Sequence, residues 1–465
     1  MNALRRLALT GVLLVALSSA SVGVAAQDFL GAWRAAAEHD HRLAVARAEH
    51  GASQALREQA DALWRPQVGL TLGVGAGAGE TAMRGARFAA PGMGQVDEAR
   101  FATSVAPGVV TRLAVIAQQP LINAGRQAQQ AQLQAAADMG DIAWHAAQTE
   151  LMLVTAERYF ALAVAEERVR VTARQAASVA RARAQAHDRY QIGSSPVTDT
   201  HEADAALAGV QAREAAATLQ ASVRRQQLAG STGIMHPSAQ LPARELMPVE
   251  GLDVWVQRSQ DANPRLRLLT QAVTVAEHKL RQHGVAGRAT LDLVAQAGHD
   301  RIAGSGDFGS ARNRELNGMV GVQLTIPLST GGMREAQERE AARRLDKARA
   351  ELDLAREEVR QQVRAAWLGL QTGGTRIAAL AEGLKAGGAR LDATRLGHEV
   401  GDRTLLDVLN AQSDHAEAEL ALAQARSEQL LTYLRLAALA DRLDETWLAQ
   451  VNATLAPANP AGGGR

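Results

Sequence analysis

Two hydrophobic patterns alternate along this chain. In four short segments the apolar side chains occupy every second position, which is typical of a β-strand with one apolar face. These segments are 66–80, 104–119, 288–301 and 317–328. Two long proline-free stretches instead read as helix, from about Gln127 to Gln191 and from about Arg334 to Val400. The patterning predicts a mainly α-helical chain that also contains two strand pairs.

The strand segments have one apolar face and one small or polar face. In the first of them Val68, Leu70, Leu72 and Val74 alternate with glutamine, glycine and threonine. This alternation is the pattern of a membrane β-barrel around a wet lumen. A half-buried sheet of a soluble protein gives the same alternation, and the strands taken alone favour that interpretation.

The two helical stretches are unusually long. The second keeps a coiled-coil seam with the spacing of three and four residues. Its members are Leu345, Ala348, Leu352, Ala355, Val359, Val363, Ala366 and Leu370. About 65 residues at 1.5 Å each make a rod of roughly 100 Å, about three times the thickness of a hydrocarbon core. We therefore expect these helices to project from a membrane and not to cross it.

The second half of the chain repeats the first. The segment QQPLINAGR from Gln118 matches TIPLSTGGMR from Thr325, and YQIGSSPVTDT from Tyr190 matches HEVGDRTLLDV from His398. We expect two repeats of helix, strand pair, long helix, tight tip and return helix, with a longer loop between the strands of the first. The repeats cover 27–230 and 251–440, the tips lie at 192–195 and 400–403, a linker occupies 231–250, and an equatorial or disordered tail occupies 441–465.

Each strand pair leads through proline and glycine into a long helix. Four strands cannot close a barrel, and lipid does not tolerate open sheet edges, so several copies must pool their strands if the sheet lies in a membrane. Two copies give an eight-stranded barrel filled by side chains, whereas three give twelve strands and a bore. Proline ends a ladder and glycine lets the chain change direction. The expected strand-to-helix joints are Pro120, Gly125, Pro327, Gly331 and Gly332.

The N-terminus has the pattern of an export signal. Arg5 and Arg6 precede an apolar run from Leu7 to Val22, and small residues up to Ala26 offer a cleavage site. We interpret 1–26 as a removable signal peptide. Because the chain has no cysteine, the mature N-terminus cannot carry the acyl anchor of a lipoprotein.

Composition excludes several classes of protein. The 50 basic and 49 acidic residues balance, which argues against a nucleic-acid partner bound through net charge. The lack of cysteine removes disulfides, thiolate metal sites and cysteine nucleophiles. Since no nucleophile motif or cofactor motif is convincing, we expect neither an enzyme nor a cofactor or metal site.

The repeated motifs resemble the TolC family of outer-membrane exit ducts. The most similar segments are GVQLTIPLSTGGMREAQ, QQPLINAGR, YQIGSSPVTDTHEADA and VGDRTLLDVLNAQSDHAEAELALAQAR. The resemblance implies a homotrimer in the outer membrane. The four strands of each protomer would form a twelve-stranded β-barrel, which continues as an α-helical coiled-coil barrel into the periplasm. It also implies partners: a periplasmic adaptor, an inner-membrane ABC transporter or other efflux pump, a transported protein or small molecule, and outer-membrane lipid.

The function that this resemblance implies is export through a tripartite machine. We favour type I secretion of a toxin-like protein, because there is no lipid anchor and because the chain is most similar to TolC around Arg403 and Asp407. Efflux of drugs or other small molecules is the alternative. An exported coiled-coil adaptor without a pore is a remote third hypothesis, since such a protein would not need two strand pairs with apolar outer faces.

By the same resemblance, the tips between the long helices would bind the adaptor. The residues concerned are Ile192, Gly193, Ser194, Val400, Gly401 and Asp402. The glycines are needed for the tight turns in any case. The periplasmic aperture of the family lies at this end of the helices.

The resemblance also implies a gate at that aperture. Arg403 corresponds to a gating arginine, with Thr198 and Asp199 as its partners on the other hairpin, and Asp407 corresponds to a pore-facing acid. Threefold repetition would make a ring of carboxylates that favours cations. Both residues could instead be ordinary solvated helix residues.

Two positions depart from the family pattern. Asn410 replaces a second acid one turn after Asp407, and His398 replaces a tyrosine of the gate network. We expect weaker cation selectivity from the first change. The second predicts a closure that depends on pH, because imidazole titrates near neutrality.

Overall fold

The computed structural model describes residues 28–92, 94–243, 250–306 and 309–455. The signal peptide expected at 1–26 therefore lies outside the described residues. The chain forms two compact units. One contains Gly51–Gly140 and Leu269–Leu352, and the other contains the described parts of Met1–His50, Asp141–Leu268 and Asp353–Arg465.

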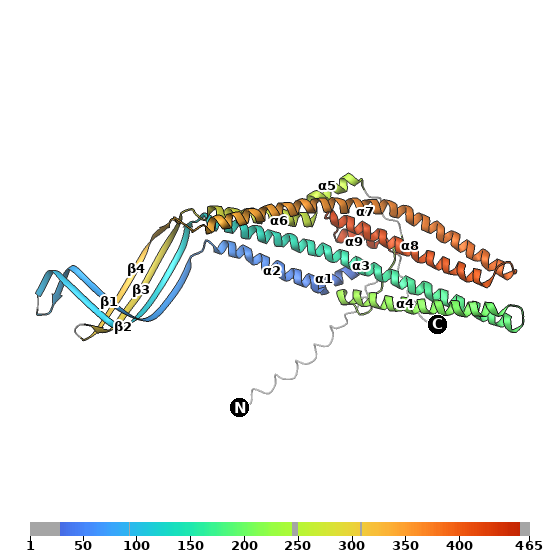
Figure 1. The fold of residues 1–465 in the computed structure, drawn as a ribbon, viewed down its shortest axis with the longest axis horizontal. Helices are drawn as coiled ribbons and strands as arrows, with labels where there is room; N and C mark the ends of the chain where they lie inside the picture. The colour runs from blue at the N-terminus through green and yellow to red at the C-terminus, as the bar shows by residue number, and fades with distance from the viewer. Residues whose placement is uncertain (1–27, 93, 244–249, 307–308, 456–465) are drawn as a thin grey trace, which may run out of the picture. The chain divides into compact units, whose positions relative to one another are not determined.

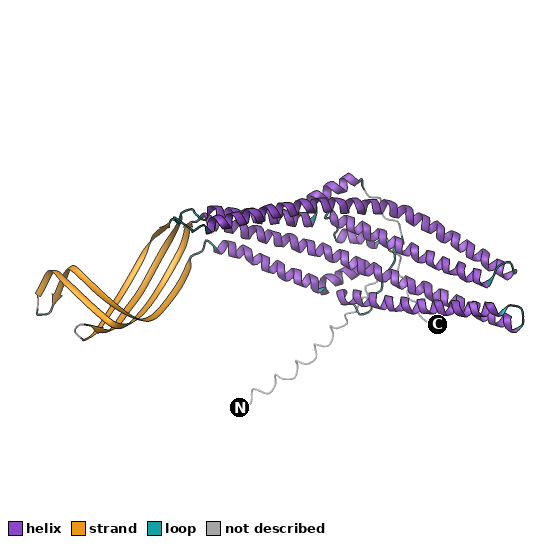
Figure 2. Cartoon of the chain, in the orientation of Figure 1, coloured by secondary structure: helices purple, strands orange, loops and turns teal. Residues whose placement is uncertain are grey.

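The first of these units contains a four-stranded antiparallel sheet (Figure 2). Its strands are β1 (Gln67–Ala90), β2 (Gly94–Ile122), β3 (Thr290–Gly306) and β4 (Gly309–Thr325), in the order β1-β2-β3-β4. The apolar side chains of β1 and β4 are exposed, for example Val68 at 70% and Val320 at 77%. Because β1 and β4 each have one unpaired edge, the sheet is incomplete in a single copy of the chain.

The first strand pair is longer than predicted. Residues 81–90 and 94–103, expected as a loop between the strands, belong instead to β1 and β2, whose ladder reaches Ala90 opposite Gly94. The register shifts between Gly77 and Gly79 and twice more before Phe88. Each shift of one residue moves the side chains to the other face, so the alternation that marks a strand is lost although the backbone stays paired.

The joints differ from the expected ones in the first repeat. Pro120 does not end β2, which runs on to Ile122. The pairing of β2 with β1 extends only as far as Gln118, which lies before Pro120. The missing N–H of Pro120 therefore removes no hydrogen bond to β1. Gly125 lies within the first turn of the following helix and does not make the turn. Asn123 instead caps the start of this helix, because its side chain accepts a hydrogen bond from the Arg126 N–H at 2.9 Å.

The second repeat has the expected kind of joint. β4 ends at Thr325, two residues before Pro327. Gly331 and Gly332 have φ values of 61° and 82°, a left-handed conformation that side chains with a Cβ atom rarely adopt. The following helix begins at Met333.

Four helices contribute to the unit that contains the sheet (Figure 1). They are the relevant parts of α2 (His41–Ala62), α3 (Ala124–Gln191), α6 (Pro264–Val285) and α7 (Met333–Glu399). Arg57 of α2 pairs with Asp138 of α3 at 2.8 Å, and the Gln271 amide donates to the Ala135 carbonyl at 3.0 Å. These polar contacts tie neighbouring helices together where many core residues are alanine.

The second unit is helical and holds the aromatic core. It contains α1 (Phe29–His39), α4 (Val197–Thr232), α5 (Leu252–Ala262), α8 (Leu405–Leu439), α9 (Glu445–Asn452) and the remaining parts of the long helices. The rings of Phe29 and Tyr159 lie 5.5 Å apart, and those of Tyr159 and Phe160 lie 5.2 Å apart. These three rings form one buried cluster.

The segment expected as a tail is ordered as far as Leu455. Asp444 caps α9 by accepting a hydrogen bond from the Trp447 N–H at 2.7 Å, and Leu448 and Val451 are buried. The Asn452 side chain accepts a hydrogen bond from the Phe29 N–H at 3.0 Å, which joins α9 to α1. Buried apolar residues at a helical spacing explain why this part of 441–465 folds; the remainder, 456–465, lies outside the described residues.

Candidate aperture and docking tips

The two tips close with the same hydrogen bonds. At the first tip the Ser194 N–H donates to the Arg189 carbonyl at 2.8 Å, and the Gly193 N–H donates to the Tyr190 carbonyl at 3.0 Å. At the second, Asp402 and Gly401 donate to the carbonyls of Gly397 and His398, at 2.8 and 3.2 Å. Both are Schellman motifs, in which the residue after the helix end is left-handed. Gly193 and Gly401 have φ values of 73° and 86° and meet this requirement.

The tips expose apolar side chains at their ends. Ile192 is 79% exposed and Val400 is 75% exposed. Behind them, buried residues of α3, α4 and α8 pack together and hold the hairpins. This cluster contains Val179, Ala186, Ala203, Val210, Leu405 and Leu409. The tips therefore present small apolar surfaces on a firmly packed base.

Asp407 is engaged by the start of its own helix. Its Oδ2 atom accepts hydrogen bonds from the Thr404 N–H at 3.0 Å and from the Thr404 hydroxyl at 2.9 Å, while the Asp407 N–H donates to that hydroxyl at 3.1 Å. This capping box satisfies free backbone groups of α8. The Thr404 hydrogen bonds and the charges of Arg403 and Arg390 hold the pKa of the Asp407 carboxyl below its usual range. Asp407 is therefore negatively charged near neutral pH.

His398 links the two hairpins of the protomer. Its Nδ1 atom lies 3.0 Å from the Arg403 carbonyl oxygen, and its Nε2 atom lies 3.4 Å from Nη1 of Arg189 on α3. A carbonyl only accepts, so Nδ1 carries the proton, and Nε2 can accept from the guanidinium only while the ring is neutral. A second proton would place two cationic groups against each other.

The expected gate residues fall into two separate grooves within one protomer. Arg403, Asp407 and Asn410 line a groove of about 390 Å³ between α7 and α8. Asp199 and His398 line another, of about 420 Å³, together with Arg181, Arg189, Arg395 and Glu399. Within the described residues of the protomer the Arg403 guanidinium has no hydrogen-bond or ion-pair partner, and so does not meet Thr198 or Asp199.

Sequence reasoning missed Thr404 and Arg189. The spacing of Thr404 and Asp407 before an apolar helix is a readable capping signal. Arg189 gives no such signal, because its role depends on where α3 lies beside α7.

The long helices differ in glycine content near the tips. The stretch of α7 from Asp353 to Glu399 contains seven glycines, and the stretch of α3 from Asp141 to Gln191 contains none. A glycine inside a helix costs about 1 kcal/mol relative to alanine. The stretch of α7 from Asp353 to Glu399, called its lower part below, is therefore intrinsically easier to bend than the stretch of α3 from Asp141 to Gln191.

An incomplete sheet with an apolar outer face, followed by long helices with exposed tips, defines the protomer of an outer-membrane channel. The sequence supports this class independently. The chain belongs to the outer membrane efflux protein family, which it matches over residues 33–234 and 255–441.

Several characterised proteins are similar to this chain. It is 33% identical over 168 residues to the outer membrane efflux protein BepC of Brucella suis, a match that spans 36% of each protein. It is 27% identical over 451 residues to the outer membrane protein TolC of Vibrio cholerae, covering 95% of this chain and 96% of TolC. It is 29% identical over 311 residues to the alkaline protease secretion protein AprF of Pseudomonas aeruginosa, covering 65% and 64% of the two chains.

Solved channel structures share the fold. The outer membrane channel CmeC of Campylobacter jejuni superimposes with a TM-score of 0.71 at 13% identity, over 92% of this chain and 90% of CmeC. The outer-membrane channel OprN gives 0.70 at 18% identity, over 89% of each chain. The expected fold class is confirmed, as are the family, the outer-membrane location and the conclusion that the protein is not an enzyme. Among the helices of the described residues, none is long and apolar enough to cross a membrane.

Proposed function

We propose that three copies of this chain form a gated exit duct, which gives a secreted protein a path across the periplasm and outer membrane. The observation that carries the proposal is the sheet with two open edges and an exposed apolar face. Such a sheet is stable in lipid only when other copies complete the barrel. A periplasmic adaptor and an inner-membrane ABC transporter would complete the machine.

The gate in this proposal is formed between protomers. The free guanidinium of Arg403 would pair with Thr198 and Asp199 of a neighbouring copy, because these groups do not meet within one chain. Charge-assisted hydrogen bonds of this kind are stronger than neutral ones. Three such links would form a closed ring around the aperture, and three Asp407 carboxylates would favour cations.

Conductance of the purified protein in planar bilayers tests the gate. The double variant R403S/D407A is expected to conduct several-fold more than the wild type and to prefer cations less. R376S is the matched control, since it removes the ion pair of Arg376 with Glu428 between the same two helices away from the tip. A large conductance that is equal in all three proteins would keep the pore and reject the gate, and no conductance in any of them would reject the duct.

The exposed tips are proposed to bind the adaptor through Ile192, Gly193, Ser194, Val400, Gly401 and Asp402. Both tips expose an apolar residue at the same position of the turn, Ile192 and Val400, which would offer the adaptor a repeated apolar contact. A photo-crosslinking amino acid at position 192 or 400 should capture a periplasmic protein in cells, and the same group at Met235, exposed in the linker, should not. Equal capture at all three positions would contradict docking at the tips.

Export of a small molecule is the second candidate, since one relative is named an efflux protein and another a protease secretion protein. Deletion of the gene separates the two. Secretion predicts that a specific protein disappears from the culture medium while drug sensitivity is unchanged. Efflux predicts the opposite pair of results.

A further inference from the structure

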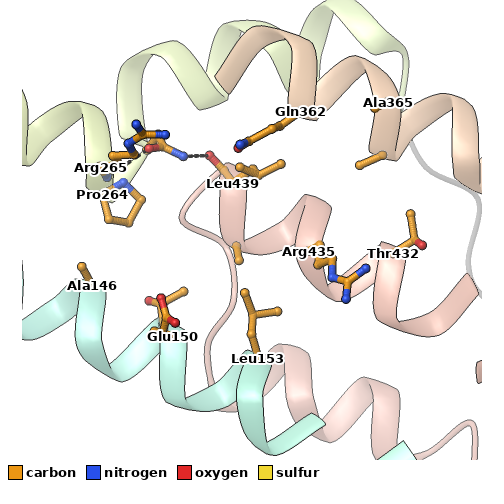
Figure 3. Close-up of a pocket in the computed structure, with 14 residues that line it drawn as sticks. Ala146, Glu150, Leu153, Pro264, Arg265, Gln362, Ala365, Thr432, Arg435 and Leu439 are labelled. Atoms are coloured by element: carbon orange, nitrogen blue, oxygen red, sulfur yellow. Dashed lines mark hydrogen bonds between the residues drawn. The ribbon is translucent and has the colours of Figure 1, made fainter. Parts of the chain in front are cut away.

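A cavity of about 500 Å³ lies at the place where α8 ends and α6 begins (Figure 3). The buried side chain of Asn263 joins the two helices. Its amide donates to the Leu439 carbonyl at 2.8 Å, and its oxygen accepts from the N–H groups of Arg265 and Leu266 at 3.0 and 3.2 Å. One residue thus caps the end of α8 and the start of α6, which fixes the rim of the cavity.

The walls of the cavity are mostly apolar and small. Ala146 and Leu153 come from α3, Ala365 and Ala366 from α7, and Pro264 from the start of α6. The volume lies within the range of about 300–1,000 Å³ found for small-molecule sites.

One carboxylate in the cavity has no partner. The two arginines of the lining are both paired, Arg435 with Glu157 at 2.7 Å and Arg265 with Glu358 at 2.8 Å. In the part of the chain that the structure describes, Glu150 has neither a hydrogen bond nor an ion pair. Figure 3 shows its side chain on α3, between Ala146 and Leu153. Glu150 is exposed, so its unpaired carboxylate lies in solvent beside the apolar walls of the cavity.

In the first half of the chain, an arginine pairs with an acid at the corresponding junction between two helices. There Asp40 caps α2 by accepting from the Arg42 N–H at 2.7 Å, and Arg158 of α3 lies 3.5 Å from its carboxylate. Arg158 lies 35 residues before the tip glycine Gly193, and Ala366 lies 35 residues before Gly401. The second repeat thus has Ala366 in place of the arginine and the neutral Asn263 in place of its acidic partner, which leaves the space beside Ala366 open.

From the apolar walls of the cavity and its unpaired carboxylate we infer that the cavity beside Glu150 binds a monovalent organic cation with an apolar body. Its charge would neutralise Glu150, and its apolar surface would cover the alanines, Leu153 and Pro264. An inorganic divalent cation is disfavoured, because Ca²⁺ takes six to eight oxygen ligands and the cavity offers one free carboxylate. An anion is disfavoured because both lining arginines are already paired.

Equilibrium dialysis of the full-length protein in lipid nanodiscs, with empty nanodiscs as the blank, tests the inference. The probe is tetraphenylphosphonium, and tetraphenylborate is the anion of similar shape. We expect saturable binding of one phosphonium per protomer and no comparable binding of the borate. E150Q keeps the shape of the side chain and should weaken binding about ten-fold, because it removes the charge that attracts the phosphonium.

Two further variants sharpen the result. A366R introduces the arginine of the first repeat and should abolish binding by occupying the cavity and pairing with Glu150. D188N, on the same helix near the tip, should leave binding unchanged. Phosphonium binding that does not saturate, or that E150Q leaves intact, would overturn the inference, as would equal binding of the borate. The assay involves no ion flow, so its outcome is independent of the gate.

Discussion

The glycines in the lower part of α7 can be tested by replacing three of them with alanine. In G373A/G383A/G387A each new Cβ atom has room. The nearest atom lies 3.5 Å away at position 373 and 3.7 Å away at 387, and none lies within 4 Å at 383. Each replacement removes backbone freedom worth roughly 0.5–1 kcal/mol. The three together should stabilise α7 locally by about 2 kcal/mol.

Amide hydrogen exchange measures this effect directly, because local opening of a helix has its own free energy. Exchange of the amides around the three positions should slow by more than ten-fold, since 1.4 kcal/mol corresponds to a factor of ten. Amides of α3 at the same level should be unchanged. G193A is a control of opposite sign, because its φ of 73° is unfavourable for alanine, and it should speed exchange at the first tip. Unchanged or faster exchange in α7 of the triple variant would refute the reasoning.

Three other predictions concern single side chains. Acidification from pH 8 to pH 5 should increase conductance, because a protonated His398 no longer accepts from Arg189; H398Q should remove the dependence, and a wild-type response that is flat over this range would contradict the link. Asp407 should not contribute to this change in conductance between pH 8 and pH 5, because its lowered pKa keeps the carboxyl charged over the whole range. Its lowered folded-state pKa gives stability that is present above about pH 4 and lost only as the pH falls further. T404A should destabilise α8 by about 1 kcal/mol through loss of the cap, seen as faster amide exchange in its first turn, whereas unaltered exchange would show that the cap is unimportant. N263A removes caps from two helices and should lower the free energy of unfolding by about 2 kcal/mol in thermal or denaturant unfolding, and a loss no larger than that of an exposed Asn410→Ala change would contradict the double cap.

Much of the fold follows from periodicity and repetition. The long helices and the four strands could be predicted because their patterns extend over many residues. The extension of β1 and β2 could not, since its bulges move side chains between faces. The sequence favours Gly125 over Asn123 as the joint, because a glycine after a proline suggests a turn even where the helix has already begun.

The site was predictable only as far as it depends on local sequence. Gly193 and Gly401 could be placed at the tips because a tight turn needs a residue with positive φ. Which charged groups meet depends on how helices far apart in sequence lie together. For this reason the contact of His398 with Arg189, and the separation of Arg403 from Asp199, required the structure.

The shared backbone design of the two tips bears on how such proteins evolve. A Schellman turn requires only a residue that tolerates a positive φ. Both repeats of the chain have a glycine at this position, Gly193 and Gly401, whereas the neighbouring positions differ. Substitutions around the glycine therefore change the surface without changing the turn. Under the docking proposal, a duct of this kind could acquire a new adaptor by a few surface mutations, with its hairpins left intact.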